Sequence, residues 1–109
     1  MAKAEFSNEL SDAQLERLAI LAEEMGEALQ CVGKVIRHGY ESYNPVINTG
    51  RTNRRELERE LGNVYVAILM LTDAKDINLA GVLMDAKDKK LSIQRWLHHQ
   101  VGEVKSGKS

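Results

Sequence analysis

The sequence has few of the residues that break helices or that staple small secreted domains. Its 109 residues include one proline and one cysteine, and aromatic side chains make up 5% of the chain. One cysteine cannot form an internal disulfide, which excludes a disulfide-stabilised scaffold and favours a reducing cytoplasm. With one proline and few β-branched runs, helix is the expected secondary structure.

Strong charge of one sign and long apolar runs are also absent. The formal net charge of -1 argues against a nucleic-acid binder that works through bulk electrostatics. No run of eighteen apolar residues occurs, and no basic segment followed by an apolar one opens the chain. We therefore expect a soluble cytoplasmic protein that binds neither nucleic acid nor a membrane.

Apolar residues recur at spacings of three and four over most of the sequence and predict three amphipathic helices. The expected ranges are 11–39, 53–75 and 78–99. They predict one all-α domain over residues 1–109, an antiparallel bundle with a loose arm at 1–10 and a flexible tail at 101–109. Three apolar stripes cannot all be covered in a chain this short, so we expect a homodimer or a larger homo-oligomer.

Polar residues mark where each predicted helix begins. Ser11 and Gln14 fit a capping box, in which each side chain reaches the backbone amide of the other residue. Asn53 and Asn78 are the expected caps of the second and third helices. Residues 38–52 have no helical period and predict an ordered, functional loop between the first two helices.

An acidic segment interrupts the apolar pattern of the first predicted helix. Glu24 and Glu27 are three residues apart, so they share one helical face, and they flank the apolar stripe. Two neighbouring carboxylates repel each other and lose solvation beside an apolar seam, which costs stability unless a cation lies between them. The alternative is an ordinary solvated helix face.

A second acidic face lies on the second predicted helix. Glu60 and Asn63 are three residues apart, and an antiparallel pairing would bring them opposite Glu24 and Glu27. Oxygen ligands of this kind suit a hard cation, Mg²⁺ or Mn²⁺. The sequence therefore indicates a possible metal site between the first two helices.

Two lysines are candidate ligands for phosphate groups. Lys34 lies two turns beyond Glu27 on the same face, and Lys90 interrupts the apolar stripe of the third helix. Either ammonium could meet phosphate oxygens of a substrate. Alternatively, each side chain could lay its methylene groups along apolar surface and keep its charge in water.

The acidic segments Glu23–Glu27 (EEMGE) and Glu60–Asn63 (ELGN) resemble the E-E-x-x-E … E-x-x-D signature of the MazG-like all-α nucleoside triphosphate pyrophosphohydrolases. The resemblance to the short phage and bacterial members extends from about residue 15 to 100. It includes the loop Arg37–Tyr43 (RHGYESY) and the ending Leu97–Gln100 (LHHQ).

The resemblance implies Mg²⁺-dependent cleavage of a nucleoside triphosphate to the monophosphate and pyrophosphate, on a helical bundle completed by a second subunit. By position, Glu24, Glu27 and Glu60 would be metal ligands, and Asn63 would occupy the fourth ligand position. Glu23 would either support the metal ligands or act as a base that orients the attacking water, and Glu24 would be catalytic as well as a metal ligand.

The resemblance also implies contacts to the base or sugar of the nucleotide. The loop residues His38 and Tyr40, and Asn53 after the loop, are the candidates.

Asn63 departs from the family pattern, which has aspartate at this position. An amide oxygen can ligate Mg²⁺, but it carries no charge and cannot accept a proton from water. One alternative function is therefore a nucleotide-sequestering protein with little or no turnover. A second alternative is a purely structural helical oligomer, in which the carboxylates are solvated or pair with Arg54, Arg55 and Arg59.

Overall fold

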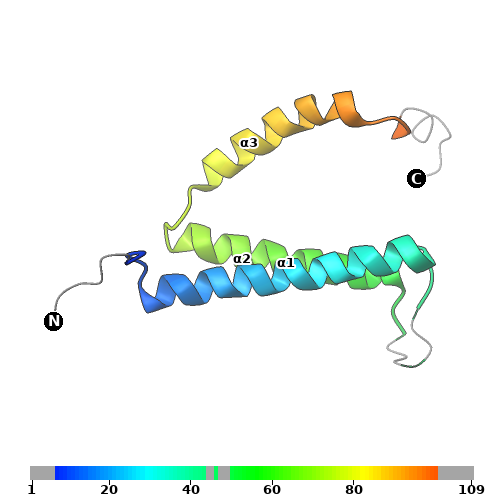
Figure 1. Ribbon diagram of the computed structural model, residues 1–109, viewed down its shortest axis with the longest axis horizontal. Coiled ribbons are helices and arrows are strands. Elements are labelled where there is room, and N and C mark those ends of the chain that lie inside the picture. Colours follow the sequence, from blue (N-terminus) through cyan, green and yellow to red (C-terminus); the bar gives the residue numbers. More distant parts are fainter. Residues whose placement is uncertain (1–6, 44–45, 47–49, 101–109) are drawn as a thin grey trace. The chain divides into compact units, whose positions relative to one another are not determined.

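The computed structural model describes residues 7–43, 46 and 50–100, and the regular structure within these ranges is helical throughout, without strands. Two compact units divide the chain, Met1–Ile77 and Asn78–Ser109. The first contains α1 (Asp12–His38) and α2 (Asn53–Asp73), and the second contains α3 (Leu79–Ser92) and the short 3₁₀ helix η1 (Ile93–Trp96) (Figure 1). The prediction of an all-α protein with three main helices is confirmed.

Helix α1 has the limits that its sequence predicts. The Ser11 hydroxyl accepts a hydrogen bond from the Gln14 amide at 3.1 Å, and the Ser11 amide donates to the Gln14 side chain at 2.8 Å. At the other end Gly39 has a φ of 86°, a value that L side chains rarely adopt, and its amide donates to the Val35 carbonyl. The capping box and the terminal glycine therefore fix α1 at both ends.

Helix α2 begins with a different cap from the predicted one. The N-cap is Thr52, whose hydroxyl accepts from the Arg55 amide at 3.2 Å, so the assignment of the cap to Asn53 is wrong. Asn53 is already helical and buried, and its side-chain amide donates to the Gly39 carbonyl at 3.1 Å. A tertiary contact thus takes the side chain that would otherwise cap the helix.

Helices α1 and α2 form an antiparallel hairpin that is fastened at both ends. At the loop end, the Asn53 amide donates to the Ser42 carbonyl at 2.7 Å and the Arg54 amide donates to the Tyr40 carbonyl at 2.8 Å. At the open end, the Arg17 guanidinium donates to both carboxylate oxygens of Asp76, with an Nε–Oδ2 distance of 2.6 Å. We call these contacts the loop-end contacts and the Arg17–Asp76 bridge.

The hairpin core consists mainly of small side chains. Among the described residues, the buried apolar side chains are Ala28, Cys31, Ala67 and Leu71. Small residues at a helix crossing allow the two backbones to approach closely. Many of the larger apolar side chains of the hairpin remain exposed; they include Leu15, Leu18, Met25, Leu29, Val32, Ile36, Leu61, Tyr65 and Val66.

The second unit begins as predicted and ends its α-helix early. The Asn78 side chain caps α3 by accepting from the Ala80 amide at 2.9 Å. The α-helix ends at Ser92 and not near His99, so that part of the prediction is wrong. The Ser92 hydroxyl donates to the Lys89 carbonyl at 3.3 Å, a contact that competes with regular helical bonding, and the chain tightens into η1.

Three further predictions concern residues that are not all described. The predicted arm at 1–10 is described from residue 7 onward. Residues 44–45 and 47–49 of the predicted ordered loop, and the whole of the predicted tail at 101–109, lie outside the described residues. Within the described ranges, none of the helices combines the length and apolarity that a membrane-spanning segment needs.

Candidate metal centre

The hairpin brings together three of the carboxylates singled out in the sequence. Glu24 and Glu27 on α1 and Glu60 on α2 each offer an oxygen, and these oxygens lie within 4.8 Å of one another. We call this group the acidic cluster. The antiparallel pairing explains the arrangement, because it sets one helical face of α1 against the matching face of α2.

Burial makes the acidic cluster unfavourable for three free anions. Glu60 is 8% exposed, and Glu24 is partly buried. The Glu24 Oε2 atom is shielded from solvent and has no hydrogen-bond partner in the structure. A buried carboxylate oxygen without a donor costs free energy that a cation would recover. Oxygen donors alone suit Mg²⁺ or Mn²⁺, so the residues fit a hard divalent cation.

The charge of the cluster also affects the protonation of Glu27. Its pKa is raised above the ordinary value, first by the negative charge of Glu24 and then by that of Glu60. Burial, a hydrogen bond with Glu60 and the charge of Glu23 act in the same direction. Without a cation the three groups therefore tend to retain a proton, as close carboxylates do.

Asn63 lies beside the cluster and faces it with its amide nitrogen. The Asn63 Nδ2 atom donates to Glu60 Oε2 at 3.4 Å, a long hydrogen bond. In this arrangement Asn63 stabilises the charge on Glu60 through a donor and does not present a fourth anion.

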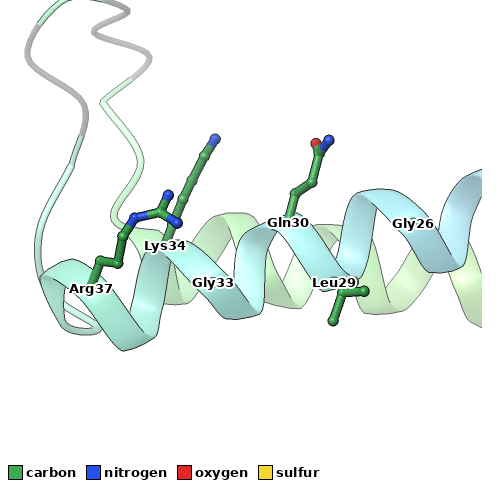
Figure 2. A pocket seen from close by; sticks show the side chains of 6 residues that line it. All are labelled: Gly26, Leu29, Gln30, Gly33, Lys34 and Arg37. Carbon is green, nitrogen blue, oxygen red and sulfur yellow. The ribbon is translucent and has the colours of Figure 1, made fainter.

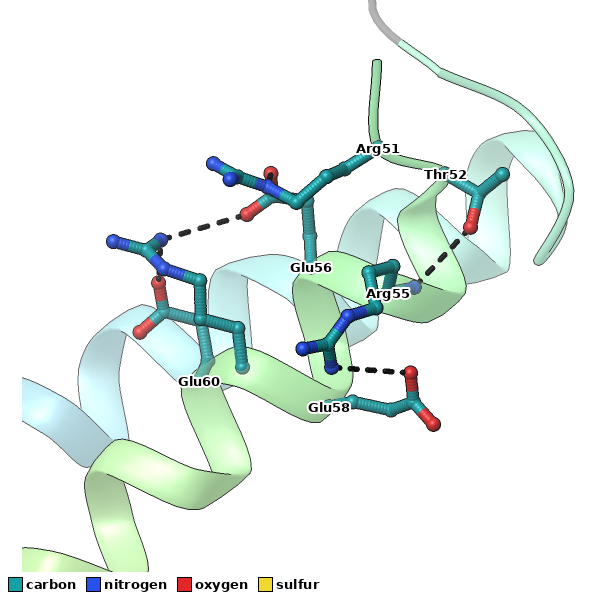
Figure 3. Close-up of polar contacts among 7 residues, drawn as sticks. Arg51, Thr52, Arg55, Glu56, Glu58 and Glu60 are labelled. Atoms are coloured by element: carbon teal, nitrogen blue, oxygen red, sulfur yellow. Dashed lines mark hydrogen bonds and ion pairs between the residues drawn. The ribbon is translucent and has the colours of Figure 1, made fainter. Parts of the chain in front are cut away.

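Two arginines, Arg51 before α2 and Arg59 within it, pair with carboxylates of this helix. Arg59 lies 3.4 Å from a Glu60 oxygen and 3.6 Å from a Glu56 oxygen, and Arg51 lies 2.6 Å from Glu56. Figure 3 shows Arg51 beside Glu56, one turn before Glu60 on α2. An ion-pair network thus connects the start of α2 to the acidic cluster.

The other arginines named in the sequence pair elsewhere. Arg55 lies 3.4 Å from Glu58, which is directed away from Glu60 (Figure 3). Arg54 lies 2.7 Å from Glu41. Of the three arginines considered as partners for the acidic cluster, Arg59 alone has an ion pair with a cluster carboxylate in the described part of the chain.

Lys34 lies in a shallow pocket of about 450 Å³ on α1, together with Arg37. Figure 2 shows Lys34 and Gln30 projecting from one side of α1, with the Arg37 side chain bent toward Lys34 and Leu29 pointing away. Arg37 was not among the predicted site residues. Its spacing of three from Lys34 was a signal for a shared face.

The predicted base and sugar contacts lie at the loop end of the hairpin. His38 is the last residue of α1 and is exposed. The Arg54 guanidinium carbon lies 4.5 Å from the centre of the Tyr40 ring, a cation–π contact. Asn53 is buried, and its side-chain amide donates to the Gly39 carbonyl. Nucleotide contact by His38, Tyr40 and Asn53 stays a prediction.

Glu23 and Lys90 do not join the acidic cluster. Glu23 is exposed on α1 and is not one of the three clustered carboxylates. Lys90 is an exposed residue of α3, in the second unit, and its contact with phosphate stays a prediction.

Comparisons with known proteins add no relative to these observations. The chain matches no protein-family model, no curated protein and no solved structure. The resemblance to the MazG-like proteins therefore rests on the acidic segments and loop of the sequence.

Proposed function

We propose that the protein is a metal-dependent nucleoside triphosphate pyrophosphohydrolase that converts a triphosphate and water to the monophosphate and pyrophosphate. The observation that carries the proposal is the meeting of Glu24, Glu27 and Glu60 within 4.8 Å, where one buried oxygen has no hydrogen-bond partner. The sequence resemblance supplies the reaction, and the acidic cluster supplies a fitting place for its cation.

The cation would be Mg²⁺, or alternatively Mn²⁺, held by oxygens of Glu24, Glu27 and Glu60. When bound, a divalent ion lowers the pKa of coordinated water and offsets the charge of phosphate oxygens. The three carboxylates bind and orient the ion. Glu60 is nearly buried, which limits the access of water to its carboxylate.

Other side chains of the hairpin take the remaining roles. Glu23, exposed beside Glu24, orients the attacking water or accepts its proton. Lys34 and Arg37 share a pocket on α1, where two positive charges suit the phosphates of the substrate. His38 and Tyr40 at the loop end are the proposed contacts to the base or sugar.

The same proposal includes a homo-oligomer. Leu29 is 70% exposed and Ile36 is 79% exposed on α1, and Leu61 and Tyr65 add apolar surface on α2. A second copy of the hairpin would cover such apolar surface, as the resemblance to subunit-completed bundles implies.

The test measures pyrophosphate release from a panel of canonical and modified triphosphates with Mg²⁺ or Mn²⁺. Glu24→Gln and Glu60→Gln are expected to abolish release, because each removes an anionic ligand and keeps the shape of the side chain. Glu58→Gln is the matched control, since Glu58 lies on the same helix and pairs with Arg55. Release that survives both cluster variants, or no release from any triphosphate, would overturn the enzymatic proposal.

Nucleotide binding without turnover is the second candidate function. The observation that favours it is the Asn63 amide, which donates to Glu60 where the family pattern has a further carboxylate. An extra anion at this position would strengthen metal binding by increasing the ligand charge.

Asn63→Asp is accordingly expected to tighten Mn²⁺ binding on the order of tenfold, a typical scale for groups that support metal ligands. If the wild type binds triphosphates without cleaving them and Asn63→Asp gains pyrophosphate release, the protein is a nucleotide-binding protein with a degenerate site. Asn63→Ala is the control that removes the amide without adding charge.

A further inference from the structure

Arg59 makes two ion pairs that differ in their geometry. Its pair with Glu56, three residues earlier, joins side chains on one helical face, as is usual in a helix. Its pair with Glu60 joins neighbouring residues, whose side chains leave a helix about 100° apart. One guanidinium nitrogen, Nη1, makes both contacts, so Arg59 bridges Glu56 and Glu60.

The charge of the acidic cluster explains the contact between Arg59 and Glu60. Glu60 is nearly buried and has Glu24 and Glu27 oxygens within 4.8 Å, so the negative potential is concentrated at that point. Among the described residues, Arg59 is the cationic side chain that touches the cluster, and its side chain is 51% exposed. It can therefore move through solvent without breaking a packed core.

A partner is in place for Arg59 when it leaves Glu60. Glu56 already lies 3.6 Å from the Arg59 guanidinium, so the arginine keeps a carboxylate partner if its contact with Glu60 is lost. Glu56 is shared with Arg51, at 2.6 Å, which limits how strongly it holds Arg59. Because Arg59 Nη1 already contacts both carboxylates, losing Glu60 would require only a small movement of the guanidinium.

We propose that Arg59 is the built-in counter-cation of the acidic cluster, and that it gives up Glu60 and keeps Glu56 when a divalent cation binds. The guanidinium neutralises Glu60 while the cluster holds no metal, and it competes with the incoming ion for the same carboxylate. This inference rests on the proposed metal site and adds a regulation of it. Metal affinity is set by the three ligands together with the arginine that the ion displaces.

The test measures Mn²⁺ binding to the full-length protein by the electron paramagnetic resonance signal of the free ion. Arg59→Gln is expected to bind Mn²⁺ more tightly than the wild type, on the order of tenfold, the scale found for groups that support metal ligands. Arg55→Gln is the matched control, because it removes the same charge one turn earlier on α2, where the arginine pairs with Glu58. Its affinity is expected to stay within about twofold of the wild type, since exposed charges are screened by salt.

The outcomes separate this inference from the proposed function. Binding that is tighter in Arg59→Gln than in Arg55→Gln supports the displacement, including the case in which only Arg59→Gln binds measurably. If the wild type binds Mn²⁺ and Arg59→Gln binds it equally well or more weakly, the displacement is overturned and the metal site still stands. No binding by any variant overturns both.

A second measurement needs no substitution and so does not depend on a variant folding. The side-chain Nε–Hε resonance of Arg59 is followed by nuclear magnetic resonance while Mg²⁺ is added to the wild-type protein. We expect the Arg59 signal to shift in step with metal binding and the Arg55 signal to stay in place. Saturation with Mg²⁺ without a shift at Arg59 would overturn the inference.

Discussion

The folded structure disfavours the charged form of the Glu27 carboxyl group. The charges of Glu24 and Glu60 raise its pKa above the ordinary value of 4.5. Below 4.5 the group is protonated in both the folded and the unfolded chain, and no penalty arises. As the pH rises from 4.5 through the higher pKa of the folded state, the unfolded chain loses its proton first, so stability falls.

Glu27→Gln is therefore expected to raise the thermal unfolding temperature near neutral pH in metal-free buffer. The gain should shrink as the pH falls toward 4.5, because the wild-type carboxyl then keeps its proton in both states. Thermal unfolding followed by circular dichroism over this range measures the effect. Glu58→Gln serves as the control, and a Glu27→Gln protein that is no more stable than wild type at neutral pH would contradict the argument.

Among the elements, α2 has a side-chain cap at its start, the Thr52 hydroxyl. Thr52 accepts from the Arg55 amide at 3.2 Å, as Figure 3 shows. Thr52→Ala leaves that amide without its cap and is expected to lower the free energy of unfolding by about 1 kcal/mol. Urea unfolding measures the loss, and Thr52→Ser should recover most of it. A fully stable alanine variant would show that the cap contributes nothing.

The Arg17–Asp76 bridge holds the open end of the hairpin. Arg17 lowers the pKa of Asp76 below its ordinary value of 3.8, chiefly through their hydrogen bond. The stabilisation is present in full above 3.8 and is lost as the pH falls through the lower pKa of the folded state.

Asp76→Asn is expected to lower the unfolding temperature by several degrees near neutral pH. Below 3.8 the difference from wild type should fade, because the wild-type carboxyl also becomes neutral. Asp73→Asn, an exposed acid near the end of α2, is the control in the same melting series. An equal loss in both variants would assign the effect to net charge and not to the bridge.

Local signals predicted the elements where tertiary contacts do not compete with them. Ser11, Gln14 and Gly39 mark the limits of α1, and the structure uses all three. Thr52 and Asn53 are both good caps, and the choice between them depends on the Gly39 carbonyl, which no local pattern brings near.

In the candidate site, too, local spacing predicted one part, and contacts that form only on folding decided the other. The spacing of Glu24, Glu27 and Glu60, with an antiparallel turn between them, was enough to predict that they meet. Arg59 was one of three arginines considered as partners for the carboxylates, and spacing alone could not single out its pair with Glu60, because neighbouring residues diverge on a helix. That pair follows from the electrostatic potential of three acids in one place, which exists only after the helices pair.

At the scale of the whole molecule, the hairpin has a small buried core and many exposed large apolar side chains among its described residues. Leu29 and Ile36 are examples from α1, at 70% and 79% exposure. If a second copy covers this surface, the unfolding temperature should rise with protein concentration, since association stabilises the folded state by mass action.

Sedimentation at a series of concentrations measures the expected assembly. Leu29→Gln should weaken association, because it places a polar group in the apolar contact. Gln30→Ala is the neighbouring control, since Gln30 projects to the other side of α1 from Leu29 (Figure 2). A monomer at every concentration, with an unfolding temperature that does not change, would contradict the oligomer.

The loop-end contacts and the Arg17–Asp76 bridge also imply an order of folding. The Asn53 contact to Gly39 spans 14 residues of sequence, whereas the Arg17–Asp76 bridge spans 59. Short loops close at lower entropic cost, so the hairpin should zip from the loop end and close its open end last. The acidic side chains therefore meet before the chain is fully fastened. A cation available at that moment would ease a step on the folding route, besides stabilising the finished protein.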